Sequence, residues 1–181
     1  MTRISVKPIV LLGLAIHSNR GQPVEIRVDA ASTLGPYKTM YAYFGYDEPN
    51  YTYMKDGKKL IGELQALSPV PVEIRAHHLL VTGDGTPALK WGSTNAYTED
   101  ANGKPVYDWT ITDRIFDTYI QVKARPFVEI GFMPEALSTK PQPYVVNWPA
   151  RDGGTGWSYP PKDYNKWAEL VRQWVLHAVA R

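Results

Sequence analysis

The sequence predicts an α/β fold in which strands and helices alternate around a parallel sheet. Three short apolar runs have the character of strands, and each precedes a helical pattern; they cover residues 40–46, 71–77 and 125–132. Such alternation is typical of parallel strands joined by helical crossovers. A doubly wound sheet and a (β/α)₈ barrel both fit three units of this kind. No G-x-G-x-x-G or P-loop motif follows any of these runs, which disfavours the nucleotide-binding folds.

The composition is that of one globular domain with an ordinary core. The chain has 181 residues, a net charge of +2 and no cysteine. The small charge gives no support for nucleic-acid binding, and the lack of cysteine excludes disulfides and Cys-based zinc sites. No metal-binding motif occurs, so we expect no metal and no cofactor.

The N-terminal sequence does not decide whether the protein is cytoplasmic or secreted. Arg3 and Lys7 precede an apolar run, residues 8–16, that resembles a signal-peptide core but lacks a small-x-small cleavage site after it. The run is too short to span a bilayer as a helix. We favour a strand or an N-terminal extension, and we expect no membrane association.

The pattern of residues 23–30 predicts a separate strand with one solvent-exposed polar face. Val24, Ile26 and Val28 alternate with charged residues, and Gly35-Pro36 then breaks the pattern. We therefore divide the chain into residues 1–36, an N-terminal extension with this strand, and residues 37–181, the α/β part.

Three helices are predicted after the three strands. The first, residues 54–67, carries leucine and isoleucine at helical spacing. The second begins with a T-x-x-D capping box formed by Thr110 and Asp113. The third begins at Pro160-Pro161, because proline suits the first turn of a helix.

Alternation within the strands separates an apolar face from a polar one. In residues 71–77 the apolar face consists of Val72, Ile74 and Ala76, and it is suited to packing against covering helices. The polar face consists of Glu73, Arg75 and His77, and it is suited to the interior of a barrel. On the third strand the corresponding polar residue is Glu129. We predict that Arg75 and Glu129 form a buried structural ion pair, because a lone buried charge is costly.

Candidate ligand-binding residues lie where strands end and in the long loops. His77 ends its strand, and strand ends are where barrel active sites collect, although a single histidine is more often structural. Asp47 and Asn50 follow the first barrel strand in a D-E-P-N sequence that turn formation alone also explains. Trp91 and Trp148 lie in long loops, where they could stack on sugar rings or simply cover helices.

Several long motifs resemble glycoside hydrolase family 39, the group of β-xylosidases and α-L-iduronidases. In chain order they are GYDEPNYTYMKDGK (45–58), RAHHLL (75–80), DRIFDTYI (113–120), RPFVEIGFMPEALS (125–138) and PPKDYNKWAELVRQWVLH (160–177). The resemblance implies a TIM barrel, here incomplete and limited to its first three βα units. It also implies that the strand at 23–30 belongs to an accessory β-sandwich.

The resemblance further implies retaining hydrolysis of a glycosidic bond by two carboxyl groups. In this family the acid/base glutamate lies in an N-E-P motif after the fourth strand, and the nucleophile lies further on. The chain contains no N-E-P, and its D-E-P at 47–49 follows the first barrel strand. We therefore expect both catalytic residues beyond Arg181, in a missing C-terminal half of the barrel.

The predicted function is that of the N-terminal part of a xylosidase-like glycosidase, inactive by itself. His77 would contact a sugar hydroxyl, and the other expected substrate-binding residues are Asp47, Asn50, Trp91 and Trp148. The partner would be a xyloside or a related glycan. Two alternatives remain: a non-catalytic carbohydrate-binding protein on a shortened fold, and a purely structural fragment.

Overall fold

The computed structural model describes residues 24–32, 34–83, 92–140 and 159–181. The chain divides into two compact units, Met1–Tyr37 and Lys38–Arg181, which are considered separately. Trp91 and Trp148 lie outside the described residues. Across those four ranges no helix is both long enough and apolar enough to cross a membrane.

The first unit contains no strand in its described part. Residues 24–29 are irregular, and the Ser32 N–H donates to the Asp29 carbonyl in a turn. Val24, Ile26 and Val28 are 86%, 81% and 83% exposed. The strand expected at 23–30 is therefore absent here, because an extended segment becomes a strand only when a second strand pairs with its backbone.

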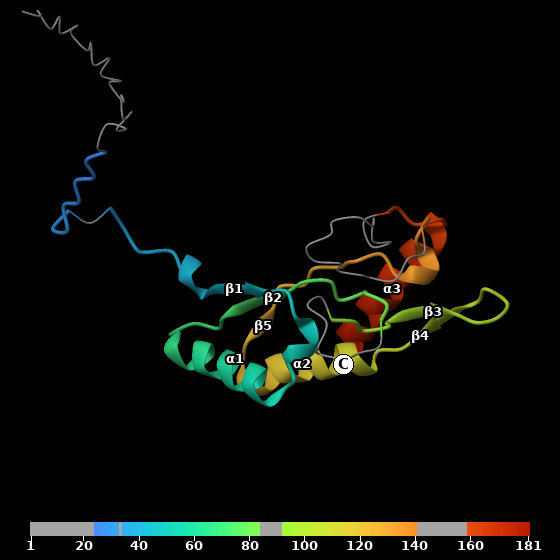
Figure 1. Ribbon diagram of the computed structural model, residues 1–181. Helices are drawn as coiled ribbons and strands as arrows, with labels where there is room; N and C mark the ends of the chain where they lie inside the picture. The colour runs from blue at the N-terminus through green and yellow to red at the C-terminus, as the bar shows by residue number, and fades with distance from the viewer. Residues whose placement is uncertain (1–23, 33, 84–91, 141–158) are drawn as a thin grey trace, which may run out of the picture. The chain divides into compact units, whose positions relative to one another are not determined.

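The second unit is built on a three-stranded parallel sheet in the order β1-β2-β5 (Figure 1). Its strands are β1 (Tyr43–Tyr46), β2 (Glu73–Ala76) and β5 (Arg125–Pro126), with Gly45 opposite Arg75 and Glu73 opposite Arg125. Parallel pairing places the carboxyl ends of all three strands at one edge, as the alternation of strands and helices predicted.

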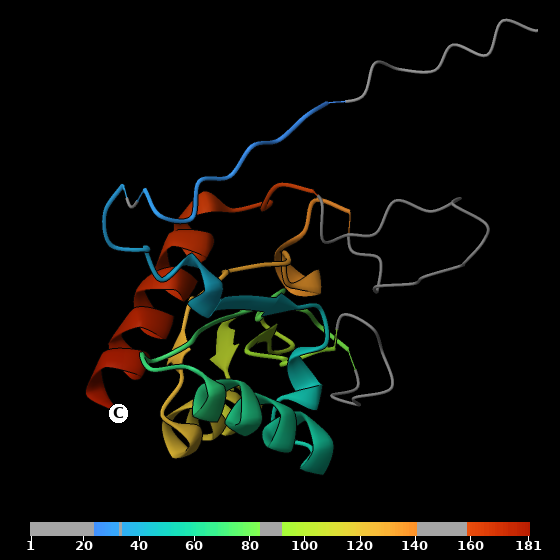
Figure 2. The same cartoon turned by 90° about the vertical axis from the view of Figure 1, so that its left-hand side faces the viewer.

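Each strand leads into a helix. Helices α1 (Lys55–Leu67) and α2 (Thr110–Val122) lie side by side along one face of the sheet (Figures 1 and 2), and α3 (Tyr164–Ala180) ends the chain. Among the described residues, 3₁₀ turns precede and follow β1, namely η1 (Met40–Ala42) and η2 (Pro49–Tyr51), and another follows β5, namely η3 (Glu135–Leu137). An antiparallel hairpin, β3 (Tyr97–Glu99) and β4 (Pro105–Tyr107), is inserted between β2 and α2.

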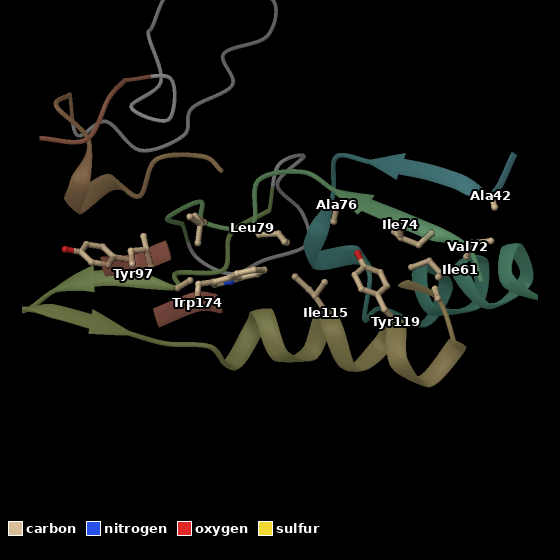
Figure 3. Close-up of a cluster of buried hydrophobic side chains, with 14 of the residues drawn as sticks. Ala42, Ile61, Val72, Ile74, Ala76, Leu79, Tyr97, Ile115, Tyr119 and Trp174 are labelled. Carbon is tan, nitrogen blue, oxygen red and sulfur yellow. The ribbon is translucent and has the colours of Figure 1, made fainter. Parts of the chain in front are cut away.

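One layer of the core lies between the sheet and helices α1 and α2, and the core continues to β3 and α3 through Tyr97 and Trp174 (Figure 3). The apolar face of β2 is almost fully buried, as its alternation predicted: Val72 is 0%, Ile74 1% and Ala76 3% exposed. Ile61 of α1 and Ile115 and Tyr119 of α2 complete this layer. Burying side chains of this kind stabilises the fold by roughly 1.5–3 kcal/mol each.

Two predicted element boundaries are wrong. The third strand stops at Pro126, opposite Ile74, instead of at residue 132, although β2 continues to Ala76. The Phe127 N–H still donates to the Ile74 carbonyl, but Gly131 accepts from the Leu80 N–H instead. The first barrel strand is also shorter than expected, because residues 40–42 form a 3₁₀ turn and the strand begins only at Tyr43.

The helix starts differ from the predicted ones as well. The capping box expected at α2 does not form, because Thr110 is already helical and Asp108 Oδ1 accepts its N–H at 2.9 Å. A hydrogen bond from the Thr110 side chain, and then this one from its N–H, lower the pKa of Asp108. Helix α3 starts at Tyr164, where Asp163 caps the N–H groups of Asn165 and Lys166.

Two glycines of α1 offer a matched test of this packing. A Cβ on Gly57 would lie 1.9 Å from the Tyr51 carbonyl oxygen, whereas a Cβ on Gly62 would meet nothing nearer than Val122 Cγ1 at 3.7 Å. We expect Gly57→Ala to lower the free energy of unfolding by about 2–3 kcal/mol through overpacking. Gly62→Ala should raise it by about 1 kcal/mol, because alanine has the higher helix propensity.

Urea unfolding of the 181-residue chain, followed by circular dichroism, measures both effects. Similar shifts of the same sign for the two variants would contradict the close approach of η2 to α1.

Candidate functional site

Polar residues from three strands gather at the carboxyl edge of the sheet. Asp47 directly follows β1, His77 directly follows β2, and Glu129 lies three residues beyond β5. The His77 N–H donates to the Tyr46 carbonyl at 3.1 Å, so the two strand ends stay paired up to the site. The carboxyl ends of parallel strands are where ligands bind in α/β folds.

The imidazole of His77 lies between two carboxylates. Its Nδ1 is 3.6 Å from Asp47 Oδ1, and its Nε2 is 3.5 Å from Glu129 Oε2. The side chain is 19% exposed, so one part of the ring remains accessible. The structure thus brings together His77 and Asp47, two of the predicted substrate-binding residues.

Arg75 and Glu129 are in contact, but they are not buried. Arg75 Nη1 lies 3.4 Å from Glu129 Oε2, and the two side chains are 44% and 36% exposed. The pair is therefore more exposed than the prediction of a buried pair implied. Gly45 leaves room for the arginine: a Cβ there would lie 3.4 Å from Arg75 Nε.

His78 contributes to the site in a way that strand alternation did not predict. Its backbone adopts a left-handed φ of 64°, the residue is 7% exposed, and its ring is stacked on Phe132. The two histidine rings meet, with His77 Nδ1 3.1 Å from His78 Nε2. Burial, together with the neighbouring His77, lowers the pKa of His78 to about 3, so its ring is neutral at physiological pH.

Asn50 is a structural residue and is not open to a ligand, contrary to the prediction. Its side chain is fully buried, accepts from the Ser93 N–H at 2.7 Å and donates to the Ser93 carbonyl at 2.9 Å. It also donates to the Tyr53 hydroxyl at 3.1 Å. The neighbouring Gly92, with a φ of 61°, has to be glycine, because a Cβ would lie 2.0 Å from Asn50 Oδ1.

A hydroxyl cluster fixes the end of β1 from the other side. Tyr46 OH lies 2.6 Å from Tyr119 OH and also contacts Thr52 Oγ1. Burial, then the nearby Tyr119, raises the pKa of Tyr46 far above its ordinary value. Together with the Asn50–Ser93 contact, this cluster anchors both sides of the segment that carries Asp47. Sequence patterns gave no signal for it, since its members are up to 73 residues apart.

The described residues hold no group of three or more histidine, cysteine or acidic side chains suited to a metal ion. The other two predicted sugar contacts, Trp91 and Trp148, fall outside the described residues. What the edge offers chemically is a set of hydrogen-bond donors and acceptors from Asp47, Arg75, His77 and Glu129.

Parallel βα units with polar side chains collected at the carboxyl edge are the arrangement found in (β/α)₈ barrels, and the second unit forms a partial α/β region of this kind. The sequence model of the family described as "Glycosyl hydrolases family 39" matches residues 24–181, so the chain belongs to that family.

Known relatives agree with this assignment. A β-xylosidase of Geobacillus stearothermophilus is 44% identical over 82 residues, which are 45% of this chain and 15% of the relative. A β-xylosidase of Caldicellulosiruptor saccharolyticus is 32% identical over 69 residues, 38% of this chain and 13% of the relative. The chain thus matches a minor part of the length of each.

Solved structures show the same fold. The family 39 enzyme of Xanthomonas axonopodis pv. citri aligns with a TM-score of 0.56 and 27% identity, over 77% of this chain and 24% of that chain. A monomeric β-xylosidase of Caulobacter crescentus CB15 aligns with a TM-score of 0.56 and 25% identity, with the same coverage. The chain is therefore β-xylosidase-like and corresponds to about a quarter of these enzymes.

The lowered pKa of His78 predicts a pH dependence of stability. The folded state binds this proton only near pH 3, whereas the unfolded chain binds it near the ordinary value of 6.5. Between these values the unfolded state holds more protons, so the free energy of unfolding should fall as the pH falls. Urea unfolding at a series of pH values should show a smaller fall for His78→Asn, since asparagine tolerates a positive φ and does not titrate. An unchanged pH profile in this variant would contradict the burial of a neutral His78.

The role of Asn50 can be tested by stability alone. Asn50→Ala removes three hydrogen bonds and leaves both backbone groups of Ser93 buried without them, so we expect a loss of about 3 kcal/mol in the free energy of unfolding. Asn102→Ala, at an exposed turn position, is the matched control and should change it by less than about 0.5 kcal/mol. Equal effects of the two changes in urea unfolding would argue against the Asn50–Ser93 contact.

Proposed function

We propose that this chain supplies the first βα units, and part of the sugar-binding edge, of a retaining β-xylosidase-like glycoside hydrolase. The observation that carries the proposal is the placement of His77 at the carboxyl edge of β2, with a carboxylate 3.5–3.6 Å from each ring nitrogen. Membership of family 39 supports a carbohydrate as the ligand.

The chemistry of this edge suits a sugar. A sugar hydroxyl both donates and accepts hydrogen bonds, and the imidazole, the carboxylates and the guanidinium provide complementary groups. His77 and Asp47 would contact hydroxyls of the glycone. Arg75 contributes a charge at 3.4 Å from Glu129 and keeps that carboxylate in place.

The hydrolytic step would be carried out by residues outside this chain. Retaining hydrolysis uses two carboxyl groups about 5 Å apart, one as nucleophile and one as general acid/base. We assign neither role to Asp47 or Glu129, because both lie against His77 and neither belongs to an N-E-P sequence. The 181-residue chain alone would then bind the glycone weakly and hydrolyse nothing.

A second candidate, a non-catalytic carbohydrate-binding protein on a shortened fold, would use the same edge. It is favoured by one observation: the cluster around His77 is assembled by this chain without any further segment. Tight, saturable glycan binding by the isolated chain, lost on replacement of Trp91 or Trp148, would favour this candidate over the glycosidase.

For the N-terminal segment we propose a role in the longer protein. The alternating apolar residues Val24, Ile26 and Val28 are exposed, and such a row is suited to pairing as a strand of an accessory β-sandwich.

The purified 181-residue chain should release no nitrophenol from p-nitrophenyl β-xyloside. The reason is that neither of the two carboxylates beside His77, Asp47 and Glu129, is assigned the nucleophile or the acid/base role. Absorbance at long incubation times measures this, with a complete β-xylosidase in the same buffer as positive control. Release of nitrophenol in proportion to the amount of chain, and persisting in His77→Ala, would overturn the proposal that hydrolysis is carried out by residues outside this chain.

A further inference from the structure

We propose that His78 is a positioning residue: its ring donates a hydrogen bond to Nδ1 of His77 and so fixes the tautomer of His77 that carries its proton on Nε2. His78 would therefore act on a ligand through His77. This inference rests on the proposed function in its last step, since a fixed His77 matters for binding only if His77 contacts the sugar.

The two histidine rings are joined at one pair of nitrogen atoms. Nδ1 of His77 lies 3.1 Å from Nε2 of His78, and the rings meet edge to face at an angle of 78° between their planes. A neutral imidazole has one N–H donor and one bare nitrogen that accepts. One nitrogen of the pair has to donate and the other to accept, so the direction of this hydrogen bond determines where each ring carries its proton.

The ring of His78 is held in place and stays neutral. The residue is 7% exposed, and its ring is stacked on Phe132 with 16° between the planes. Burial, and then the neighbouring His77, lower the pKa of His78 to about 3. At physiological pH the ring of His78 thus keeps one N–H with which it can donate to His77.

Two carboxylates favour one direction of the hydrogen bond. Nε2 of His77 is 3.5 Å from Glu129 Oε2, and Nδ1 is 3.6 Å from Asp47 Oδ1. Carboxylate oxygens only accept, so a bare nitrogen beside one of them faces a negative charge without a proton between them. His78 supplies a donor beside Nδ1, and this N–H offsets the repulsion there. The favoured arrangement therefore has Nδ1 bare and the proton of His77 on Nε2.

A fixed tautomer defines what His77 offers to a ligand. The His77 side chain is 19% exposed, and Nδ1 is already engaged by His78. A sugar oxygen that reaches Nε2 would meet an N–H donor and would act as the acceptor. Without His78, the same oxygen would meet a mixture of donor and acceptor, which weakens recognition.

The experiment is ¹⁵N NMR of the imidazole groups in the labelled 181-residue chain at about pH 8, above the ordinary pKa of histidine. A protonated and a bare ring nitrogen have widely separated ¹⁵N chemical shifts, so the spectrum reports the tautomer directly. The chain has four histidines, and His77→Gln identifies the signals of His77. We expect the shift of a protonated nitrogen for Nε2 of His77 and that of a bare nitrogen for Nδ1.

Two variants separate hydrogen bonding from packing. His78→Phe keeps a ring that can stack on Phe132 but has no donor, whereas His78→Gln loses the ring and places an amide N–H near the position of Nε2. In His78→Phe both nitrogens of His77 face a carboxylate at nearly equal distance. We therefore expect Nδ1 to carry a proton in roughly half of the molecules or more. His78→Gln should keep the tautomer of the unchanged chain.

A third variant guards against loss of folding, which the backbone amide spectrum reveals. If His78→Phe does not fold, His78→Asn replaces it, because asparagine tolerates a positive φ and is too short to reach Nδ1 of His77. It should move the proton of His77 in the same direction.

Titration with methyl β-xyloside connects the tautomer with sugar binding. We expect a saturable shift of the His77 signals in the unchanged chain. His78→Phe should bind the xyloside about 2- to 10-fold more weakly, which corresponds to one hydrogen bond, and His78→Gln should bind it as the unchanged chain does.

The outcomes separate this inference from the proposed function. The same His77 tautomer in His78→Phe as in the unchanged chain would overturn the inference, as would a proton on Nδ1 in the unchanged chain. Equal affinities of the unchanged chain and His78→Phe would overturn the effect of the tautomer on binding. If the tautomer changes as expected but His77 does not respond to methyl β-xyloside, the proposed sugar contact fails and the hydrogen bond between the two histidines stands.

Discussion

The burial of one face of β2 determines where the polar residues of the site lie. Val72, Ile74 and Ala76 are packed against α1 and α2, and this apolar contact is what orients the strand. Because side chains alternate, the same burial forces Arg75 and His77 to the opposite face. A shift of register by one residue would expose three apolar side chains and bury the polar ones, among them the charged Arg75, at a cost of many kcal/mol.

The segment after β1 depends on a second, independent constraint. The Asn50 side chain hydrogen-bonds both backbone groups of Ser93, and the Tyr46 hydroxyl joins β1 to Tyr119 of α2. These contacts lie on both sides of Asp47, the residue that reaches His77. Buried networks of this kind act cooperatively and fix one arrangement. The position of Asp47 is therefore set by residues that themselves touch no ligand.

The sequence predicted the elements better than it predicted the site. Helix α1 and strand β2 were predicted correctly because their apolar residues recur with periods of 3.6 and 2 residues, which can be recognised within a short stretch of sequence. The contact of Arg75 with Glu129 followed from the same alternation. Asn50 was misjudged because its partner, Ser93, is 43 residues away, and no local pattern reveals such a pairing. His78 was missed because a left-handed backbone in a histidine has no sequence signature comparable to that of glycine.

The expectation for the third strand failed because an apolar composition does not fix the residue at which pairing with the neighbouring strand ends. The resemblance to family 39 supplied what physics alone could not, namely the choice of a barrel over a doubly wound sheet. The matched family model and the solved relatives confirm the family and its fold, whereas the sugar contacts stay proposals.

The charged side chains on the polar face of the sheet lie in pairs of opposite charge. Glu73 lies 3.7 Å from Arg125, and Arg75 lies 3.4 Å from Glu129, so each carboxylate has a cation beside it on the neighbouring strand. In solvent such pairs add little stability, and chance alone would give many surface charges without partners. Inside a barrel an uncompensated charge would cost several kcal/mol, whereas a matched pair is tolerated. Pairing across strands is thus the property expected of residues that face the interior of a (β/α)₈ barrel.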